Sequence, residues 1–193
     1  MSDTGRFKRS ANLITRPLLA GAMAMSAIPA IDAQAAIYMK ITASGNFDGE
    51  VTVKGHEKEI ALNSFSDGLS AVVSASGGGG GAGKPSCGPI EVTKMLDKAS
   101  PPLMAALFKG TTLNKVVISF SATRKDTLVD YYVVTLTDAQ LSAFTQDSGG
   151  DRPSESLEMI PRQIDVSYKV QDEKGTLGSP ITAHIDCVNN KAT

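Results

Sequence analysis

The sequence has no tryptophan, only two cysteines and only two histidines among its 193 residues. With so few side chains of the kinds that bind transition metals, we expect neither a metal centre nor a cofactor. Nineteen basic residues oppose twenty acidic ones, which gives a formal net charge of −1. Because no basic field extends over such a chain, we expect neither nucleic acid nor a membrane surface as a partner of the mature protein.

What is present is an ordinary globular composition. Hydrophobic residues make up 41% of the chain and charged residues 20%. A chain of this length and apolar content can bury one core of usual size, whereas two typical domains would need more residues. We therefore expect a single folded domain.

The N-terminal segment differs in composition from the rest of the chain. The stretch 17–31 carries no charge, and it follows a segment rich in positive charge: Arg6, Lys8, Arg9 and Arg16. It is shorter than the roughly 20 residues that span a bilayer as a helix. Ala33 and Ala35 have the small side chains that signal peptidase accepts, and Ala36 follows. We predict that 1–35 is an export signal cleaved after Ala35; the alternatives are a disordered extension and a start codon assigned too far upstream.

Residues 36–193 show the alternation of apolar and polar residues that is typical of half-buried β-strands. It is clearest in 36–42 and 164–170, and it recurs in 128–138 and 181–187. The segment 115–120 is instead a continuous β-branched run, which suits a strand covered on both faces. We expect about eight strands in all.

One segment predicts a short helix, at 100–109. Ser100 is its expected N-cap, Pro101 fits the first turn, and Gly110 suits the C-terminal cap. Leu103, Ala106 and Leu107 lie on one stripe of this helix and could seal the open end of a sheet. The expected fold is mainly β: a compact antiparallel β-barrel of two packed sheets, formed by 36–193, with one short flanking helix.

Loops are predicted at three segments rich in glycine, serine or charge: 77–83, 146–156 and 172–180. The first fits the G-x-x-x-x-G-K pattern of a phosphate-binding loop. That chemistry needs a serine or threonine after the lysine and a helix behind it, whereas Pro85 follows here. A flexible glycine loop is the better interpretation.

No residue pattern points to catalysis. His56 and His184 have no clustered partner, so we expect solvated or hydrogen-bonded surface roles for both. Carboxylates are expected on strand exteriors and loops. A Ser–His–Asp arrangement could still be assembled from distant residues, but no nucleophile motif is present, and we expect no enzyme activity.

The two cysteines, Cys87 and Cys187, enclose about 100 residues of chain. If the protein is exported, they could form a disulfide in an oxidising compartment. Alternatively, Cys187 is an ordinary buried thiol, since it shares its face with Ile181, Ala183 and Ile185.

Several segments together resemble the haemolysin-coregulated protein (Hcp) family of type VI secretion systems. They are AIYMKI (36–41), GHEKEIALNSFSDGLS (55–70), the glycine loop, VTKMLDKASPPLMAAL (92–107), DRPSESLEM (151–159) and IDVSYKVQDEKGTLGSP (164–180). The resemblance spans nearly all of 36–193, and TK-x-x-DKASP with RP-S-ES is its most specific part. It implies the same β-barrel with one flanking helix.

The resemblance also implies a structural role without catalysis. Hcp proteins form hexameric rings that stack into the inner tube of a contractile machine and are expelled with its spike, some carrying effectors in the lumen. The implied partners are the chain itself, the sheath, the spike and effectors. The implied ring-stacking loop comprises Gly77, Gly78, Gly79, Gly80, Gly81, Gly83 and Lys84.

The chain departs from the family pattern at Asp67 and His184, where bulky or aromatic residues are usual, and at its N-terminus. Family members normally start near Ala36 and leave through the tube. Two hypotheses follow. In the first, this is a tube protein, cytoplasmic before firing, whose extension is dispensable or misassigned. In the second, it is an exported Hcp-like binding module that acts in the periplasm or outside the cell, apart from any tube.

Overall fold

The computed structural model describes residues 35–73, 82–124, 127–172 and 176–193. These contain one helix, α1 (Ser100–Lys109), and the strands β1 (Ala35–Thr42), β2 (Ile60–Ser66), β3 (Leu69–Val73), β4 (Ala82–Cys87), β5 (Ile90–Met95), β6 (Thr112–Arg124), β7 (Thr127–Asp147), β8 (Ser154–Ile160), β9 (Gln163–Gln171), β10 (Leu177–Asp186) and β11 (Lys191–Ala192). Among the described residues, no helix has the length and hydropathy needed to cross a membrane.

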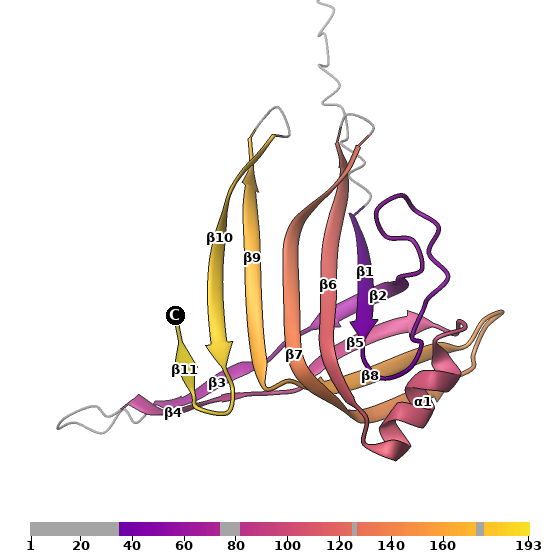
Figure 1. The fold of residues 1–193 in the computed structure, drawn as a ribbon, viewed down its shortest axis with the longest axis horizontal. Helices are drawn as coiled ribbons and strands as arrows, with labels where there is room; N and C mark the ends of the chain where they lie inside the picture. Colours follow the sequence, from indigo (N-terminus) through magenta and orange to yellow (C-terminus); the bar gives the residue numbers. More distant parts are fainter. Residues whose placement is uncertain (1–34, 74–81, 125–126, 173–175) are drawn as a thin grey trace, which may run out of the picture. The chain divides into compact units, whose positions relative to one another are not determined.

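Six antiparallel strands close into a barrel. The order is β7–β6–β1–β2–β5–β8, and β8 pairs with β7 to complete the circle. The other three strands of this nine-stranded sheet are β9, β10 and β11. They continue the sheet from β7 and form a wall beside the barrel (Figure 1). The expected fold class, an antiparallel barrel with one short helix, is thereby confirmed.

Strand β7 belongs to both parts because it changes partner along its length. Tyr132–Thr137 pair with β9, whereas Gln140–Asp147 pair with β8. Asp138 lies between the two stretches with a φ of 49°, in the left-handed region that bends an extended chain. The bend turns the second half of β7 away from the wall and into the barrel.

The barrel interior is filled by the alternating apolar residues of its strands, as the period of two predicts. Fully buried members from several strands are Met39, Ile60, Val92, Leu113, Val116, Ile118, Leu136, Leu157 and Met159. Helix α1 packs against this core through Leu103, Ala106 and Leu107, and it lies at one end of the barrel (Figure 1). The predicted stripe is therefore the one that seals the end.

The predicted helix bounds, Pro101 in the first turn and the Gly110 cap are confirmed, but the N-cap is wrong. Ala99 holds the N-cap position, with no side-chain cap hydrogen bond. Ser100 is instead the first helical residue, and its hydroxyl accepts a hydrogen bond from the backbone N–H of Asp97. The hydroxyl is drawn away from capping geometry because buried charged groups surround it.

Three predicted loops are shorter than expected. Strand β4 already includes Gly83, β8 begins at Ser154, and β10 begins at Leu177. In each case the segment has an antiparallel partner: β4 pairs with β3, β8 with β5, and β10 with β9. The hydrogen bonds of such pairing outweigh a local composition of glycine, serine and proline.

Candidate functional site

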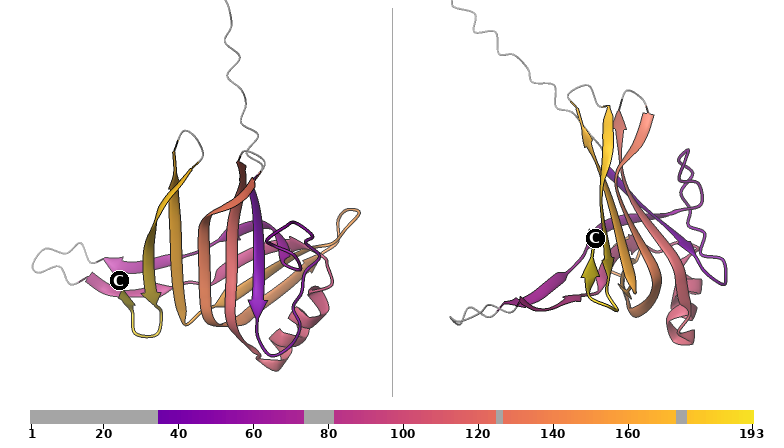
Figure 2. Two further views of the ribbon diagram at one scale, coloured as in Figure 1. Left: turned by 45° about the horizontal axis from the view of Figure 1, so that its top comes forward. Right: turned by 60° about the vertical axis from the view of Figure 1, so that its left-hand side comes forward.

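Strands β3 and β4 form a separate two-stranded sheet, which we call the arm. It extends from the ends of β2 and β5 and projects away from the barrel in both views of Figure 2. Register pairs Leu69 with Cys87 and Ser70 with Ser86, and the two serine hydroxyls lie 3.0 Å apart.

Two of the predicted ring-stacking residues fall on the arm. Gly83 and Lys84 belong to β4, and Lys84 is exposed. Gly77, Gly78, Gly79, Gly80 and Gly81 lie outside the described residues. The phosphate-loop alternative fails on structure, because the lysine continues into a strand and no helix follows it.

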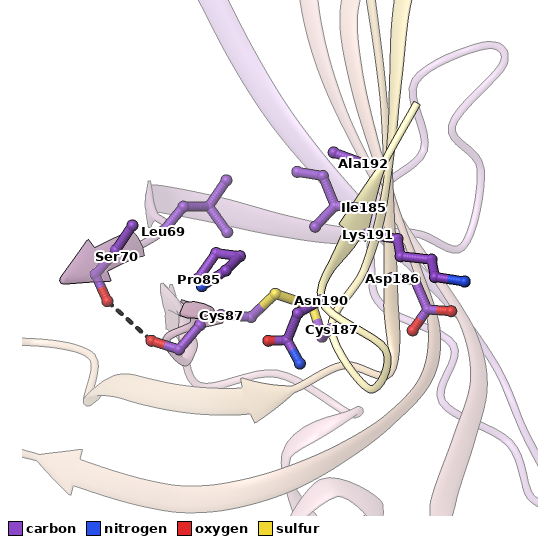
Figure 3. Close-up of a pocket in the computed structure, with 12 residues that line it drawn as sticks. Leu69, Ser70, Pro85, Cys87, Ile185, Asp186, Cys187, Asn190, Lys191 and Ala192 are labelled. Carbon is purple, nitrogen blue, oxygen red and sulfur yellow. Dashed lines mark hydrogen bonds between the residues drawn. A yellow bond between two sulfur atoms is a disulfide. The ribbon is translucent and has the colours of Figure 1, made fainter. Parts of the chain in front are cut away.

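A disulfide joins Cys87 to Cys187 across the base of the arm, with Cα atoms 5.6 Å apart. Cys187 follows β10 directly, in the turn that leads to β11. The bond therefore connects the arm to the C-terminal hairpin, as Figure 3 shows. Of the two sequence alternatives, the structure has the bonded one.

A cleft of about 290 Å³ lies between the arm and the C-terminal hairpin (Figure 3). Its lining is largely apolar and includes Leu69, Pro85, Ile185 and the disulfide. Leu69 is 53% exposed, so this surface is open to solvent. This apolar lining gives the cleft the character of a packing surface between the arm and the hairpin.

A second feature is a charged cluster, centred on a fully buried Lys94–Glu155 pair, that joins three strands to the helix. Lys94 of β5 donates to Glu155 of β8 at 2.6 Å and lies 2.8 Å from the carboxylate of Asp97. Ser100 of α1 accepts from Lys94 at 2.9 Å, and Gln146 of β7 donates to the second oxygen of Glu155. Every charge is paired, which is the condition for burying it.

Sequence reasoning missed this cluster, because Glu155 was placed in a loop and carboxylates were expected in solvent. The signal was present in the alternation: Lys94 shares a face with Ile90 and Val92, and Glu155 shares one with Leu157. Apart from Gln146, the cluster lies within TK-x-x-DKASP and RP-S-ES, the two most specific segments of the resemblance. These segments therefore meet in space, where they fix α1 to the barrel.

The expectation that His56 lies on the surface is wrong. Its ring is buried, stacks on Tyr38 with centroids 4.3 Å apart, and lies between two carboxylates. Nδ1 is 2.8 Å from Glu59, and Nε2 is 3.2 Å from Asp130 of β7. These contacts fasten the segment 43–59 onto β1 and β7. His184 does keep a half-exposed position, hydrogen-bonded to Asp165 at 2.7 Å.

The residues around His56 form the only Ser–His–acid arrangement in the described part of the chain. Ser121 Oγ lies 3.3 Å from His56 Nε2, and Glu59 contacts the other ring nitrogen. Ser121 is fully buried, and its hydroxyl donates to Asp130. A nucleophile must reach a carbonyl carbon, so this serine has a structural role.

Burial raises the pKa of Tyr38 above its ordinary value of 10.0, and the nearby carboxylates of Asp130 and Glu59 add to the effect. Because the folded pKa is raised, the stabilisation is complete below pH 10 and is lost as the pH rises through the folded pKa. We expect Tyr38→Phe to flatten the loss of stability between pH 9 and pH 11, as measured by urea unfolding. An equally steep loss in both proteins would contradict this.

The predicted cleavage site lies at the start of β1. Ala33 is outside the described residues, while Ala35 pairs with Ala122 and Ala36 with Ser121. Cleavage after Ala35 would leave all but the first residue of β1. The cleavage itself stays a prediction.

Three comparisons place the chain among known proteins. A family model for the type VI secretion system effector Hcp matches residues 38–168, more than half of the chain. Protein hcp1 of Pseudomonas aeruginosa is 33% identical over 95 residues, which are 48% of this chain and 59% of that protein. The matched region thus spans less than two thirds of that relative.

Solved structures show the same fold. A type six secretion system protein superposes with a TM-score of 0.74 at 24% identity, covering 82% of this chain and 99% of that one. Hcp1 from Salmonella typhimurium gives a TM-score of 0.65 at 24% identity, with the same coverage. The resemblance inferred from sequence segments is confirmed: the chain belongs to the Hcp family of type VI secretion system proteins.

Proposed function

We propose that this chain is a tube subunit of a type VI secretion system that forms hexameric rings and stacks them through the arm. Family membership supports a structural role in secretion. In this role the rings are expelled with the spike, contact the sheath and carry effectors in the lumen. We assign no catalytic step to the chain.

The observation that carries the proposal is the open edge of the wall. In the described residues, β10 pairs with β9 on one side, but only Ile185 and Asp186 have a partner in β11 on the other. The edge over Leu177–Ala183 is unpaired there. The free backbone N–H and C=O groups of an unpaired edge strand can bind another chain. In a closed ring, every subunit can cover the edge of its neighbour in this way.

The face beside this edge is apolar, although it lies outside the barrel. Tyr168 pairs with Ile181 across β9 and β10, and the two side chains are 44% and 63% exposed. Val170, on the same face of β9, is 50% exposed. Contiguous exposed apolar side chains of this kind mark protein interfaces. A second copy of the chain is the partner that the proposed ring supplies.

The test is Ile181→Lys, measured by light scattering over a concentration series. We expect wild-type protein to be hexameric, and the variant to need at least about tenfold more protein for the same mass, because assembly would bury an unpaired charge. Thr182→Lys is the matched control, since it adds the same charge on the opposite face of β10. A monomeric wild type would overturn the proposal, and equal assembly of all three proteins would remove this face from the interface.

The second hypothesis, an exported binding module, is favoured by one observation, the disulfide. Disulfides persist in oxidising compartments and are rare in the cytosol. N-terminal sequencing of native protein from fractionated cells separates the two. Periplasmic protein that begins at Ala36 would support the module, and cytoplasmic or tube-associated protein would support the tube subunit.

A further inference from the structure

The arm joins the barrel at two glycines that face each other, Gly68 and Gly88. The backbone N–H of Gly88 donates to the carbonyl oxygen of Gly68 at 2.6 Å. A β-carbon on Gly88 would lie 2.8 Å from that same oxygen, closer than real side chains come. Two glycines contribute no side-chain packing, so the joint by itself fixes the direction of the arm only weakly.

The disulfide spans this joint. Cys87 is the last residue of β4, directly before Gly88, and Cys187 belongs to the C-terminal hairpin. Asn190 of the same hairpin faces the carbonyl oxygen of Pro85 in β4. The bond therefore ties the arm to an element that is 100 residues away in sequence. Among the described residues, β3 and β4 pair with each other and with no other strand.

An isolated two-stranded sheet is marginally stable in water. The arm is such a sheet: short, with exposed side chains at Leu69, Ser70 and Ser86, among others. Its order depends on what it is attached to. Apart from its backbone connections at Gly68 and Gly88, its covalent attachment is the disulfide.

Both cysteines border surface clefts. Cys87 and Cys187 are half-buried and line two clefts, the apolar one of about 290 Å³ and another of about 680 Å³. The second cleft is lined by polar residues that include Arg162, Asp138 and Asn190. A small thiol therefore has two clefts from which to approach the bond.

We propose that the Cys87–Cys187 disulfide is a redox-controlled strut: when formed it holds the arm in place, and when reduced by a small dithiol it frees the arm at the glycine joint. One thiolate of the dithiol attacks a sulfur of the bond and forms a mixed disulfide. The second thiol of the dithiol then attacks the mixed disulfide, which releases the second cysteine as a thiol and forms the cyclic disulfide. Cys87 and Cys187 gain two electrons and two protons in total, and the dithiol becomes a cyclic disulfide.

Through this disulfide, the rigidity of the arm depends on the redox state of the compartment. Thiols stay reduced in the cytosol, so the arm is loose there, and it stiffens in an oxidising environment outside. Resting on the proposed function, oxidation would strengthen the contacts between rings once the protein has left the cytosol, because a preorganised contact loses less conformational freedom on binding.

The test compares hydrogen exchange in the full chain, oxidised and after treatment with dithiothreitol. At labelling times too short for global unfolding to expose the barrel, reduction is expected to raise exchange at least about tenfold in the arm strands, Leu69–Val73 and Ala82–Cys87, and to leave β1 and β6 protected. The double variant Cys87→Ser/Cys187→Ser should match the reduced protein and ignore dithiothreitol. Unchanged exchange in the arm would overturn the strut, and so would a rise of equal size throughout the barrel.

Sedimentation of stacked rings, measured on the same samples, separates the strut from the proposed function. Stacking that weakens on reduction supports both. An arm that loosens while stacking stays the same supports the strut and contradicts the arm as the stacking contact.

Discussion

Replacing Lys94 by methionine is expected to lower the free energy of unfolding by about 3–5 kcal/mol. The side chain is fully buried and is the cation for both Glu155 and Asp97. Methionine fills a similar volume, so most of the loss comes from the Glu155 carboxylate, which stays buried without its counter-charge. Chemical denaturation at neutral pH, with the barrel followed by circular dichroism, measures the effect.

Two further variants show whether unpaired charge is the cause. Lys98→Met removes an exposed lysine from the same segment and should change stability by less than about 0.5 kcal/mol. The double variant Lys94→Met/Glu155→Met removes both charges and should recover part of the loss, because well-packed apolar residues can replace a buried ion pair. A double variant no more stable than Lys94→Met would contradict this explanation.

Removing the disulfide with Cys87→Ser/Cys187→Ser is expected to cost about 4–5 kcal/mol under oxidising conditions. The bond closes a loop of 100 residues, which restricts the unfolded chain more than a short loop does. Thermal or urea unfolding of wild type and variant measures the difference.

The control is the wild-type protein in reductant, which should unfold at the same midpoint as the double serine variant. Because the bond attaches the arm and not the barrel core, both proteins should keep the native circular dichroism of the barrel at low denaturant. Wild-type protein that unfolds at one midpoint with and without reductant would show that the disulfide contributes nothing to stability.

Local patterns predicted the regular elements well. Alternation in 36–42 and 164–170 marks β1 and β9, and the proline and glycine signals bound α1 to the residue. Each of these signals arises from the chain within one element, where side-chain period and backbone preference act directly. The strands β4 and β8 were missed in part because their glycine, proline and serine residues oppose strand formation locally.

The sequence by itself determined the fold class, the helix, the apolar faces of the strands and helix, and the family. Apolar periodicity and the order of motifs are properties of the linear sequence. Only the tertiary structure decided which distant residues meet. Lys94 and Glu155 are 61 residues apart, His56 and Asp130 come from a loop and a strand, and the two cysteines are 100 residues apart. These pairings depend on barrel closure and strand register, and no local preference of the chain encodes either.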